Sequence, residues 1–209
     1  QSRSKATFDE MSDAYKNLAA SGMKPDFKGY EKISLTSEVL VLVQANVEQT
    51  EAAGDGLVEV ITAATPFYGE AGGQVGDVGT IEGAGGKMAV EQTLKDPTGL
   101  IIHKGRIISG SLKKGETVTL TVDQSKRRAT ELNHTATHIL HSVLRKVLGE
   151  HVKQAGSLVA PDRLRFDFTH FSQVDSDTLD TIERLVNLRI RENIPTNTQE
   201  MDADDAFKS

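Results

Sequence analysis

Short β-prone segments recur roughly every ten residues between residues 33 and 123, and turn-forming residues separate them. The five clearest segments are EVLVLVQANVEQ, LVEVITAA, MAVEQTLK, LIIHKGRI and ETVTLTVD. Short strands at such regular spacing are typical of small barrels and sandwiches. We therefore predict a small glycine-rich β-barrel over residues 33–124.

Glycine is concentrated between two of these segments. The stretch FYGEAGGQVGDVGTIEGAGG, residues 67–86, contains eight glycines in twenty residues. Barrel turns explain most of them, because glycine tolerates positive φ and close approach of another backbone. The need for turns does not explain why Gln74 lies among these glycines. Its amide can present both a hydrogen-bond donor and an acceptor. Such a loop suits a small polar ligand or an oxyanion, and Thr65 and Tyr68 could add hydroxyls.

After residue 124 the apolar pattern changes from strand to helix. The segment TELNHTATHILHSVLRKVLG predicts an amphipathic helix that ends at Gly149. Two strands around a turn at residues 160–162 follow. A second helix, capped by Asp175 or Ser176, ends before the next proline. The sequence therefore predicts an α/β domain over residues 125–209, and an α+β protein as a whole.

The first predicted helix carries three of the six histidines of the chain. At about 100° per residue, His138 lies about 40° from His134, and His141 about 20° to its other side. The apolar residues face roughly the opposite direction, so these histidines lie away from the core face of the helix.

Two interpretations of this histidine face stay open. It is either a solvated polar face or a metal site shared by His134 and His138, which i, i+4 spacing allows. Thr135 stands where the H-E-x-x-H metalloprotease motif has glutamate, so a protease is disfavoured. Two ligands also do not complete a tetrahedral zinc site.

Composition excludes several classes of protein. The chain has no cysteine, so disulfides and a thiol nucleophile within it are excluded. P-loop, dinucleotide-binding and nucleophile-elbow motifs are absent from the sequence. No apolar run approaches the roughly 18 residues of a membrane helix, and no signal-peptide pattern occurs, so we expect a cytoplasmic chain without membrane contact.

The charge balance limits the kind of nucleic-acid contact. A net charge of −6 argues against a broad nucleic-acid-binding face, but a small basic patch could still bind one end of an RNA. Lys126, Arg127, Arg128 and Arg145 are the candidates for such a patch. They could equally be solvated helix charges.

The glycine-rich and histidine-rich motifs together resemble one known family. TPFYGEAGGQVGDVG, residues 65–79, precedes LNHTATHILHSVLRKVLGEHVKQAGSLVAPDRLRFDF, residues 132–168. This pair resembles the editing region of alanyl-tRNA synthetase, and free-standing alanyl-tRNA editing proteins share both motifs. Threonyl-tRNA synthetase has a similar histidine domain but lacks the glycine-rich barrel. Residues 1–32, ending in DFKGYEK, resemble the linker that joins the upstream tRNA-recognition region of the bacterial synthetase to its editing region.

The resemblance implies a proofreading hydrolase, an alanine–tRNA ligase editing region that releases serine or glycine from Ser-tRNA(Ala) and Gly-tRNA(Ala). Gln74 matches the glutamine that lies beside the substrate in the family, and Thr65 stands where a hydroxyl could read the serine side chain. With His134 and His138 these residues form the expected catalytic set. The expected partners are the 3′ end of tRNA(Ala) and the remainder of the synthetase chain, which binds ATP in the full-length enzyme.

The resemblance also implies zinc, held by His134 and His138 together with a Cys and a His from a later C-x-x-x-H segment. That segment has no match up to Ser209, so we expect a C-terminally truncated domain that binds zinc weakly or not at all. Two other interpretations remain. One is a free-standing trans-editing deacylase, which the segment 1–32 disfavours, and the other is a non-catalytic RNA-binding module.

Overall fold

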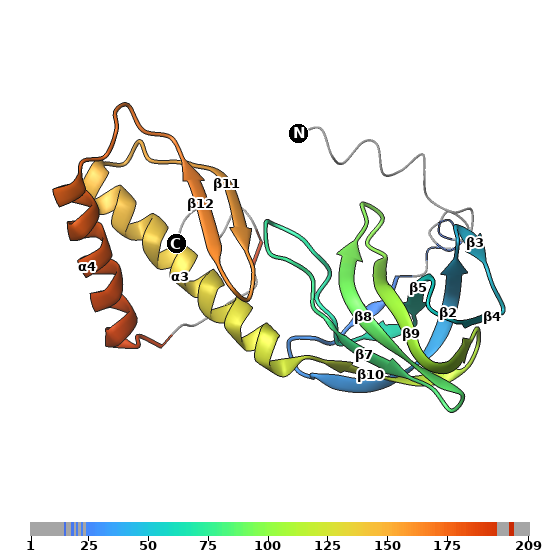
Figure 1. Ribbon diagram of the computed structural model, residues 1–209. Coiled ribbons are helices and arrows are strands. Elements are labelled where there is room, and N and C mark those ends of the chain that lie inside the picture. The colour runs from blue at the N-terminus through green and yellow to red at the C-terminus, as the bar shows by residue number, and fades with distance from the viewer. Residues whose placement is uncertain are drawn as a thin grey trace. The chain divides into compact units, whose positions relative to one another are not determined.

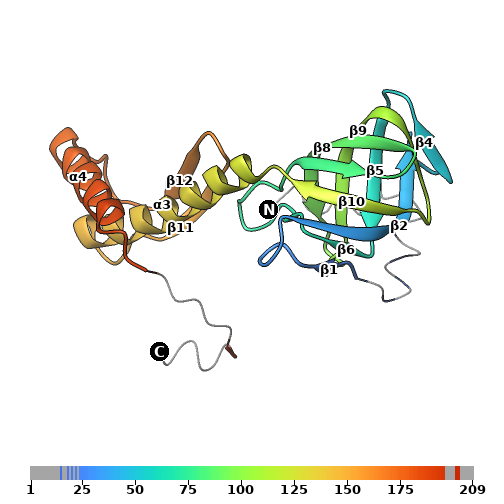
Figure 2. The ribbon, with the colours of Figure 1, turned by 90° about the horizontal axis from the view of Figure 1, so that it is seen from below.

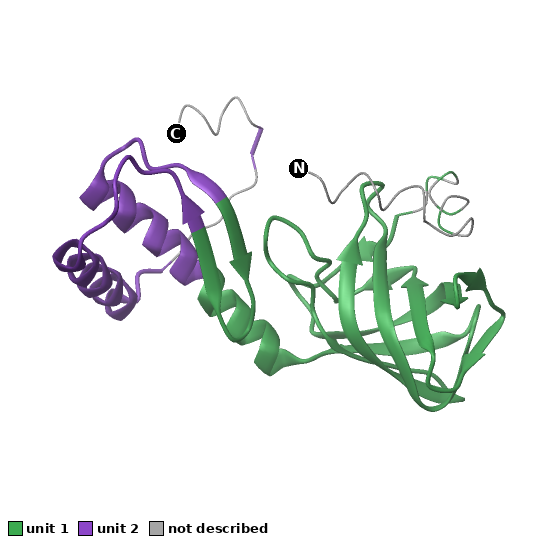
Figure 3. Cartoon of the chain, turned by 45° about the horizontal axis from the view of Figure 1, so that its top comes forward, with its two compact units in different colours: residues 1–134, 156–166 green, residues 135–155, 167–209 purple. Residues whose placement is uncertain are grey.

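The computed structural model describes residues 15, 18, 20, 22, 24–195 and 201–202. The chain divides into two compact units, which Figure 3 shows in two colours. Unit 1 contains residues 1–134 and 156–166, and unit 2 contains residues 135–155 and 167–209. These bounds differ from the expected 33–124 and 125–209, because the first part of the histidine helix and the turn of the following hairpin cluster with the barrel. Most of the expected linker before residue 24 lies outside the described residues.

Most of the described elements are labelled in Figure 1, and β1 and β6 are labelled in Figure 2. In chain order they are β1 (Asp26–Phe27), β2 (Ser34–Gln44), β3 (Val47–Glu48), β4 (Glu51–Ala53), β5 (Leu57–Thr62), β6 (Ala64–Thr65), β7 (Gly79–Glu82), β8 (Gly86–Lys95), β9 (Ile101–Lys113), β10 (Thr117–Val122), α3 (Gln124–Leu148), β11 (Gln154–Val159), β12 (Leu164–Phe168) and α4 (Ser176–Glu192).

Six strands form a closed antiparallel barrel (Figure 2). They follow the order β10-β7-β8-β9-β5-β2, and the pairing of β10 with β2 closes the ring. Along β10 the sequence TVTLTV alternates strictly between exposed threonines and buried valines or leucine, as the two-residue period of a strand requires. The predicted α+β class with a small β-barrel is therefore confirmed.

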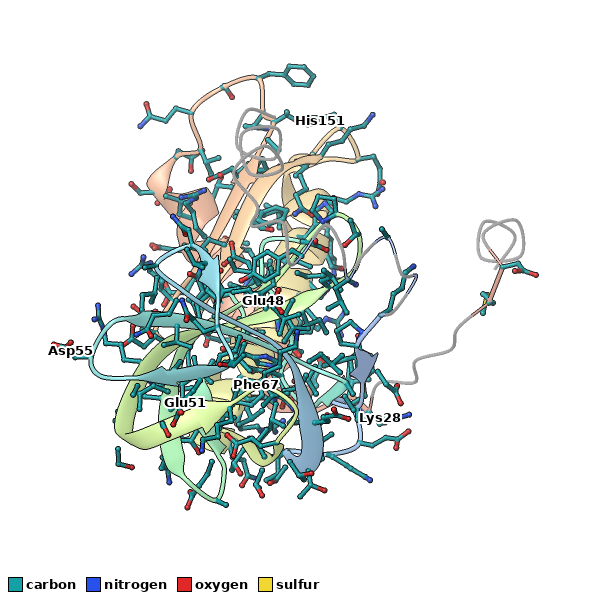
Figure 4. All side chains as sticks on the ribbon, turned by 90° about the vertical axis from the view of Figure 1, so that its right-hand side faces the viewer. Lys28, Glu48, Glu51, Asp55, Phe67 and His151 are labelled. Atoms are coloured by element: carbon teal, nitrogen blue, oxygen red, sulfur yellow. The ribbon has the colours of Figure 1, made fainter. Side chains whose placement is uncertain are left out.

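The barrel interior is a single apolar core. Phe67, labelled in Figure 4, lies fully buried among its strands. The core also contains Val39, Leu42, Ala52, Val58, Val60, Ile81, Met88, Val90, Ile107, Leu112, Val118, Leu120 and Val122. Most of these residues lie in the segments that alternate in the sequence, so the pattern that predicts the strands also identifies the core.

Strand β1 belongs to the segment expected to be a linker. It pairs in parallel with β6, with Phe27 opposite Thr65, and so ties residues 26–27 to the start of the glycine-rich loop. This contact is long-range, and no local sequence pattern predicts it.

Both predicted helices are present, with identifiable caps. The Asp123 carboxylate accepts the Lys126 N–H at 3.1 Å before α3, and the helix ends at Gly149 with φ of 117°. The Asp175 carboxylate accepts the Thr178 N–H at 2.8 Å, as expected of the cap of α4. Strands β11 and β12 pair around the predicted turn.

None of the described helices is both long enough and apolar enough to cross a membrane.

Candidate functional site

The glycine-rich loop between β6 and β7 contains a tight turn that places Gln74. Ala71 and Gln74 exchange two backbone hydrogen bonds of 3.2 and 3.0 Å. Gly72 and Gly73 lie between them with φ of 61° and 85°, a backbone conformation that favours glycine at both positions. Two of the glycines noted in the sequence are therefore required by the turn itself.

The loop is fixed alongside β11. The Val75 N–H donates to the Val159 carbonyl at 3.0 Å, and the Val159 N–H donates to the Gly73 carbonyl at 2.8 Å. A Cβ atom at Gly73 would lie 2.5 Å from the Ser157 Oγ, so a side chain there would push the loop off the strand. Gln74 is thus held by backbone on both sides.

Gln74 meets His134, which lies on α3 within the same compact unit. The His134 Nδ1 and the Gln74 Oε1 are 2.6 Å apart. An amide oxygen only accepts hydrogen bonds, so the His134 Nδ1 is the donor in this contact. A histidine that donates one ring N–H to a protein carbonyl is oriented as metal-binding histidines usually are. The contact joins the two sequence motifs at their central residues.

His138 lies one turn further along α3, and its side chain is exposed. Its position four residues after His134 is the i, i+4 arrangement expected from the sequence. Within the residues that the structure describes, no group of three or more His, Cys, Asp or Glu side chains is gathered in a way that could hold a metal ion. The described chain therefore offers at most two imidazole ligands at this point.

Thr65 is placed differently from the other predicted site residues. It is fully buried, and its hydroxyl lies 2.8 Å from the Nε2 of His103 and 3.0 Å from the Phe67 N–H. The His103 Nδ1 donates to the Val60 carbonyl at 2.9 Å, so its Nε2 accepts from the Thr65 hydroxyl. With no exposed surface, Thr65 is shielded from any ligand in the present conformation.

His103 was not singled out by the sequence. Burial lowers its pKa to about 4, so the ring is neutral at pH 7, and it packs edge-on against Phe67 at 5.1 Å between ring centroids. Its place within the apolar segment LIIHKGRI was the available signal, since a polar residue in a buried strand must find internal partners.

The four predicted RNA-binding residues separate into two groups. The Arg127 side chain is only 11% exposed and is engaged inside the protein by Asp77, Gly29 and Pro66. Lys126 is exposed, and the Arg128 and Arg145 side chains are 69% and 46% exposed. The structure therefore gives Arg127 an internal role and leaves the other three at the surface.

A cavity of about 780 Å³ adjoins the glycine-rich loop. Val75 and Gly76, which follow Gln74, lie in its wall, and so does Thr130, one helical turn before His134. The remaining lining residues are Leu57, Glu70, Asp77, Val78, Glu91, Gln92, Lys104, Lys126, Arg127, Pro161 and Asp162. Its wall thus carries acidic and basic side chains together, which suits a polar ligand with charges of both signs.

Comparison with known proteins supports a single family. The family described as tRNA synthetases class II (A) matches residues 1–126. An alanine–tRNA ligase of Desulfosudis oleivorans is 52% identical over 208 residues, which is 100% of this chain and 24% of the relative. An alanine–tRNA ligase of Thermotoga maritima is 50% identical over 186 residues, which is 89% of this chain and 21% of the relative.

A third relative gives the same result. An alanine–tRNA ligase of an Anaeromyxobacter species is 46% identical over 197 residues, or 94% of this chain and 22% of the relative. The chain thus spans about a quarter of the length of the relatives that it matches.

Proposed function

The chain belongs to the class II (A) family of tRNA synthetases, and from this premise we propose that it is the editing region of an alanine–tRNA ligase. Its reaction is hydrolysis of the ester that joins serine or glycine to tRNA(Ala). The hydrogen bond between Gln74 and His134 is the observation that carries this proposal, because it joins the glycine-rich loop and the histidine helix at the two residues expected to act.

The physical need for such a reaction follows from the size of the substrates. Serine differs from alanine by one hydroxyl and glycine by one methyl group, and a pocket built for alanine rejects either by only about 1–3 kcal/mol. A second site that hydrogen-bonds the serine hydroxyl removes mischarged serine and spares alanine, which lacks that group; this contact selects serine and not glycine, which also has no hydroxyl.

Gln74 has two roles in this proposal. Its carbonyl fixes the orientation of His134, and its NH₂ group has two donors for the substrate. A donor aimed at the ester carbonyl stabilises the negative charge that develops on this oxygen when water attacks. The rigid turn around Gln74 supports this role, since the donor is already oriented before the substrate binds.

His134 and His138 fit a zinc ion as two of its ligands. The hydrogen bond to Gln74 orients the His134 ring, and His138 follows four residues later on α3, at the spacing that a shared ion needs. Two further ligands would have to come from residues that the structure does not describe. When bound, zinc would supply Lewis-acid polarisation of the substrate or of a water molecule.

The cavity beside the loop is the proposed place for the 3′ end of the tRNA. Lys126 in its wall and Arg128 at the surface of the same helical turn can contact phosphates, which position an RNA without reading its sequence. Contact with one short single-stranded end needs few cations, and this agrees with a net charge of −6.

The test is hydrolysis of Ser-tRNA(Ala), Gly-tRNA(Ala) and Ala-tRNA(Ala) by the full-length protein. We expect release of serine and glycine while alanine stays attached, and we expect His134→Ala to slow the release. His170→Ala is the matched control, since His170 lies in another part of the chain, paired with His151 at 2.9 Å. Binding of tRNA without any hydrolysis would contradict the proposal and favour a non-catalytic RNA-binding module.

A further inference from the structure

We propose that Asp77 and Arg127 are positioning residues that hold Gln74 and His134 together, an inference that rests on the proposed function. Asp77 lies at one end of the loop that carries Gln74. Arg127 lies on the helix that carries His134 and donates hydrogen bonds to both ends of that loop.

Arg127 ties the two ends of the glycine-rich loop to one point. Its guanidinium donates to the Pro66 carbonyl at 2.6 Å, before the loop, and to both carboxylate oxygens of Asp77, after the turn. A further N–H donates to the Gly29 carbonyl at 2.8 Å, just after β1. One side chain therefore gathers three backbone segments that are distant in the sequence.

Asp77 closes the base of the loop from within. Its carboxylate accepts the Tyr68 N–H at 2.6 Å, and its own N–H donates to the Tyr68 carbonyl at 2.9 Å. Its carbonyl accepts the Thr93 hydroxyl at 2.7 Å, which anchors the base to β8. The segment from 69 to 76 is thus a closed loop on a fixed base, with Gln74 in its turn.

The helix contacts this loop at two levels. Arg127 and His134 are seven residues apart on α3, which is close to two turns, so both lie on one face. Arg127 holds the base of the loop and His134 meets Gln74 in its turn. A helix bound at both levels can neither slide nor rotate against the loop without breaking one of the contacts.

The chemistry of the pair suits this role. The side chains of Arg127 and Asp77 are 11% and 7% exposed, so water competes little for their hydrogen bonds. The planar guanidinium donates in several fixed directions, and lysine, with a single ammonium group, cannot reach the same four acceptors. Arg127→Lys therefore keeps the charge and removes the geometry.

The test is a double-mutant cycle on the full-length protein, with Arg127→Lys, Gln74→Ala and the double variant measured on Ser-tRNA(Ala). We expect Arg127→Lys to lower kcat about 10- to 100-fold with KM nearly unchanged, because a shift of about 1 Å at reacting groups has such an effect. In the Gln74→Ala background Arg127→Lys should cause little further loss, since it acts through Gln74. Asp77→Asn, made in the same way, covers the case in which Arg127→Lys does not fold.

Glu48→Gln is the matched control. Glu48 on β3 forms an ion pair with Lys114 at 2.5 Å, neither residue lines the cavity beside the loop, and the loss of this pair should leave hydrolysis unchanged. Losses that multiply fully in the double variant, or a raised KM with unchanged kcat, would overturn the positioning role while leaving the proposed function intact. Normal hydrolysis by Gln74→Ala alone would instead reject the proposed function, and the inference with it.

Discussion

His103 should make the barrel sensitive to acid. The ring is fully buried, and its pKa falls from the usual 6.5 to about 4, because burial disfavours the charged form. The folded state therefore binds fewer protons than the unfolded state between these two values. The contribution of His103 to stability is fully present above pH 6.5 and is lost as the pH falls toward 4. A difference of about 2.5 units corresponds to about 3 kcal/mol, at about 1.4 kcal/mol per unit.

Urea unfolding between pH 7 and pH 4 measures this effect. The chain has two compact units, so the transition is best followed by NMR signals of barrel-core methyl groups such as those of Val60 and Ile81. His103→Gln is the comparison, because an amide can still donate to Val60 and accept from Thr65 but does not titrate. We expect the free energy of unfolding of the wild type to fall by about 3 kcal/mol more than that of the variant. Parallel curves for the two proteins would refute the reasoning.

Three further predictions concern the loop, the tRNA and the metal. Gly76→Ala should displace the glycine-rich loop and slow hydrolysis of Ser-tRNA(Ala), because the added Cβ would lie 1.8 Å from the Thr93 carbonyl oxygen. Gly85→Ala is the mild control, because its Cβ would lie 3.2 Å from its nearest neighbour. Equal activities of the two variants would contradict this role of Gly76. Replacing Lys126 and Arg128 by alanine should weaken tRNA binding and reduce the slope of log affinity against log salt by about one per lost phosphate contact, whereas an unchanged slope would exclude both residues. In a metal titration this 209-residue chain should bind zinc weakly, because the described residues supply only His134 and His138 to the proposed zinc site. Tightly held stoichiometric zinc would count against this.

Local sequence patterns predicted the elements well and their long-range pairing poorly. The alternation of TVTLTV indicates a strand, and Asp175 before an amphipathic segment indicates the start of a helix, because both signals are local. The closure of the barrel pairs Thr119 with Thr36, and the β1–β6 contact pairs Phe27 with Thr65. Such partners are selected by the packing of the whole core, which no single segment encodes.

The residues of the candidate site can likewise be predicted one by one, but their contact with one another cannot. The sequence identifies Gln74 as an amide within a glycine turn and His134 as one of several histidines on a polar helix face, each from its own surroundings. Their 2.6 Å contact joins residues 60 positions apart and could not be derived from spacing. For Arg127 the local sequence predicts an exposed, RNA-binding side chain, because it stands in a run of three basic residues. The fold instead buries it against Asp77. A charged side chain is expected to be exposed unless the fold brings an oppositely charged partner next to it.

The most direct test of the proposed site is single-turnover hydrolysis of Ser-tRNA(Ala) by Gln74→Ala, compared with Gln44→Ala. Gln44 is another glutamine of the barrel, and its side chain donates to the Ala53 carbonyl at 3.1 Å. We predict that Gln74→Ala releases serine about 100-fold more slowly than the wild type, the loss typical of one missing oxyanion donor, while Gln44→Ala keeps the wild-type rate. Equal rates for the wild type and both variants would contradict the assignment of the Gln74–His134 pair as the editing site.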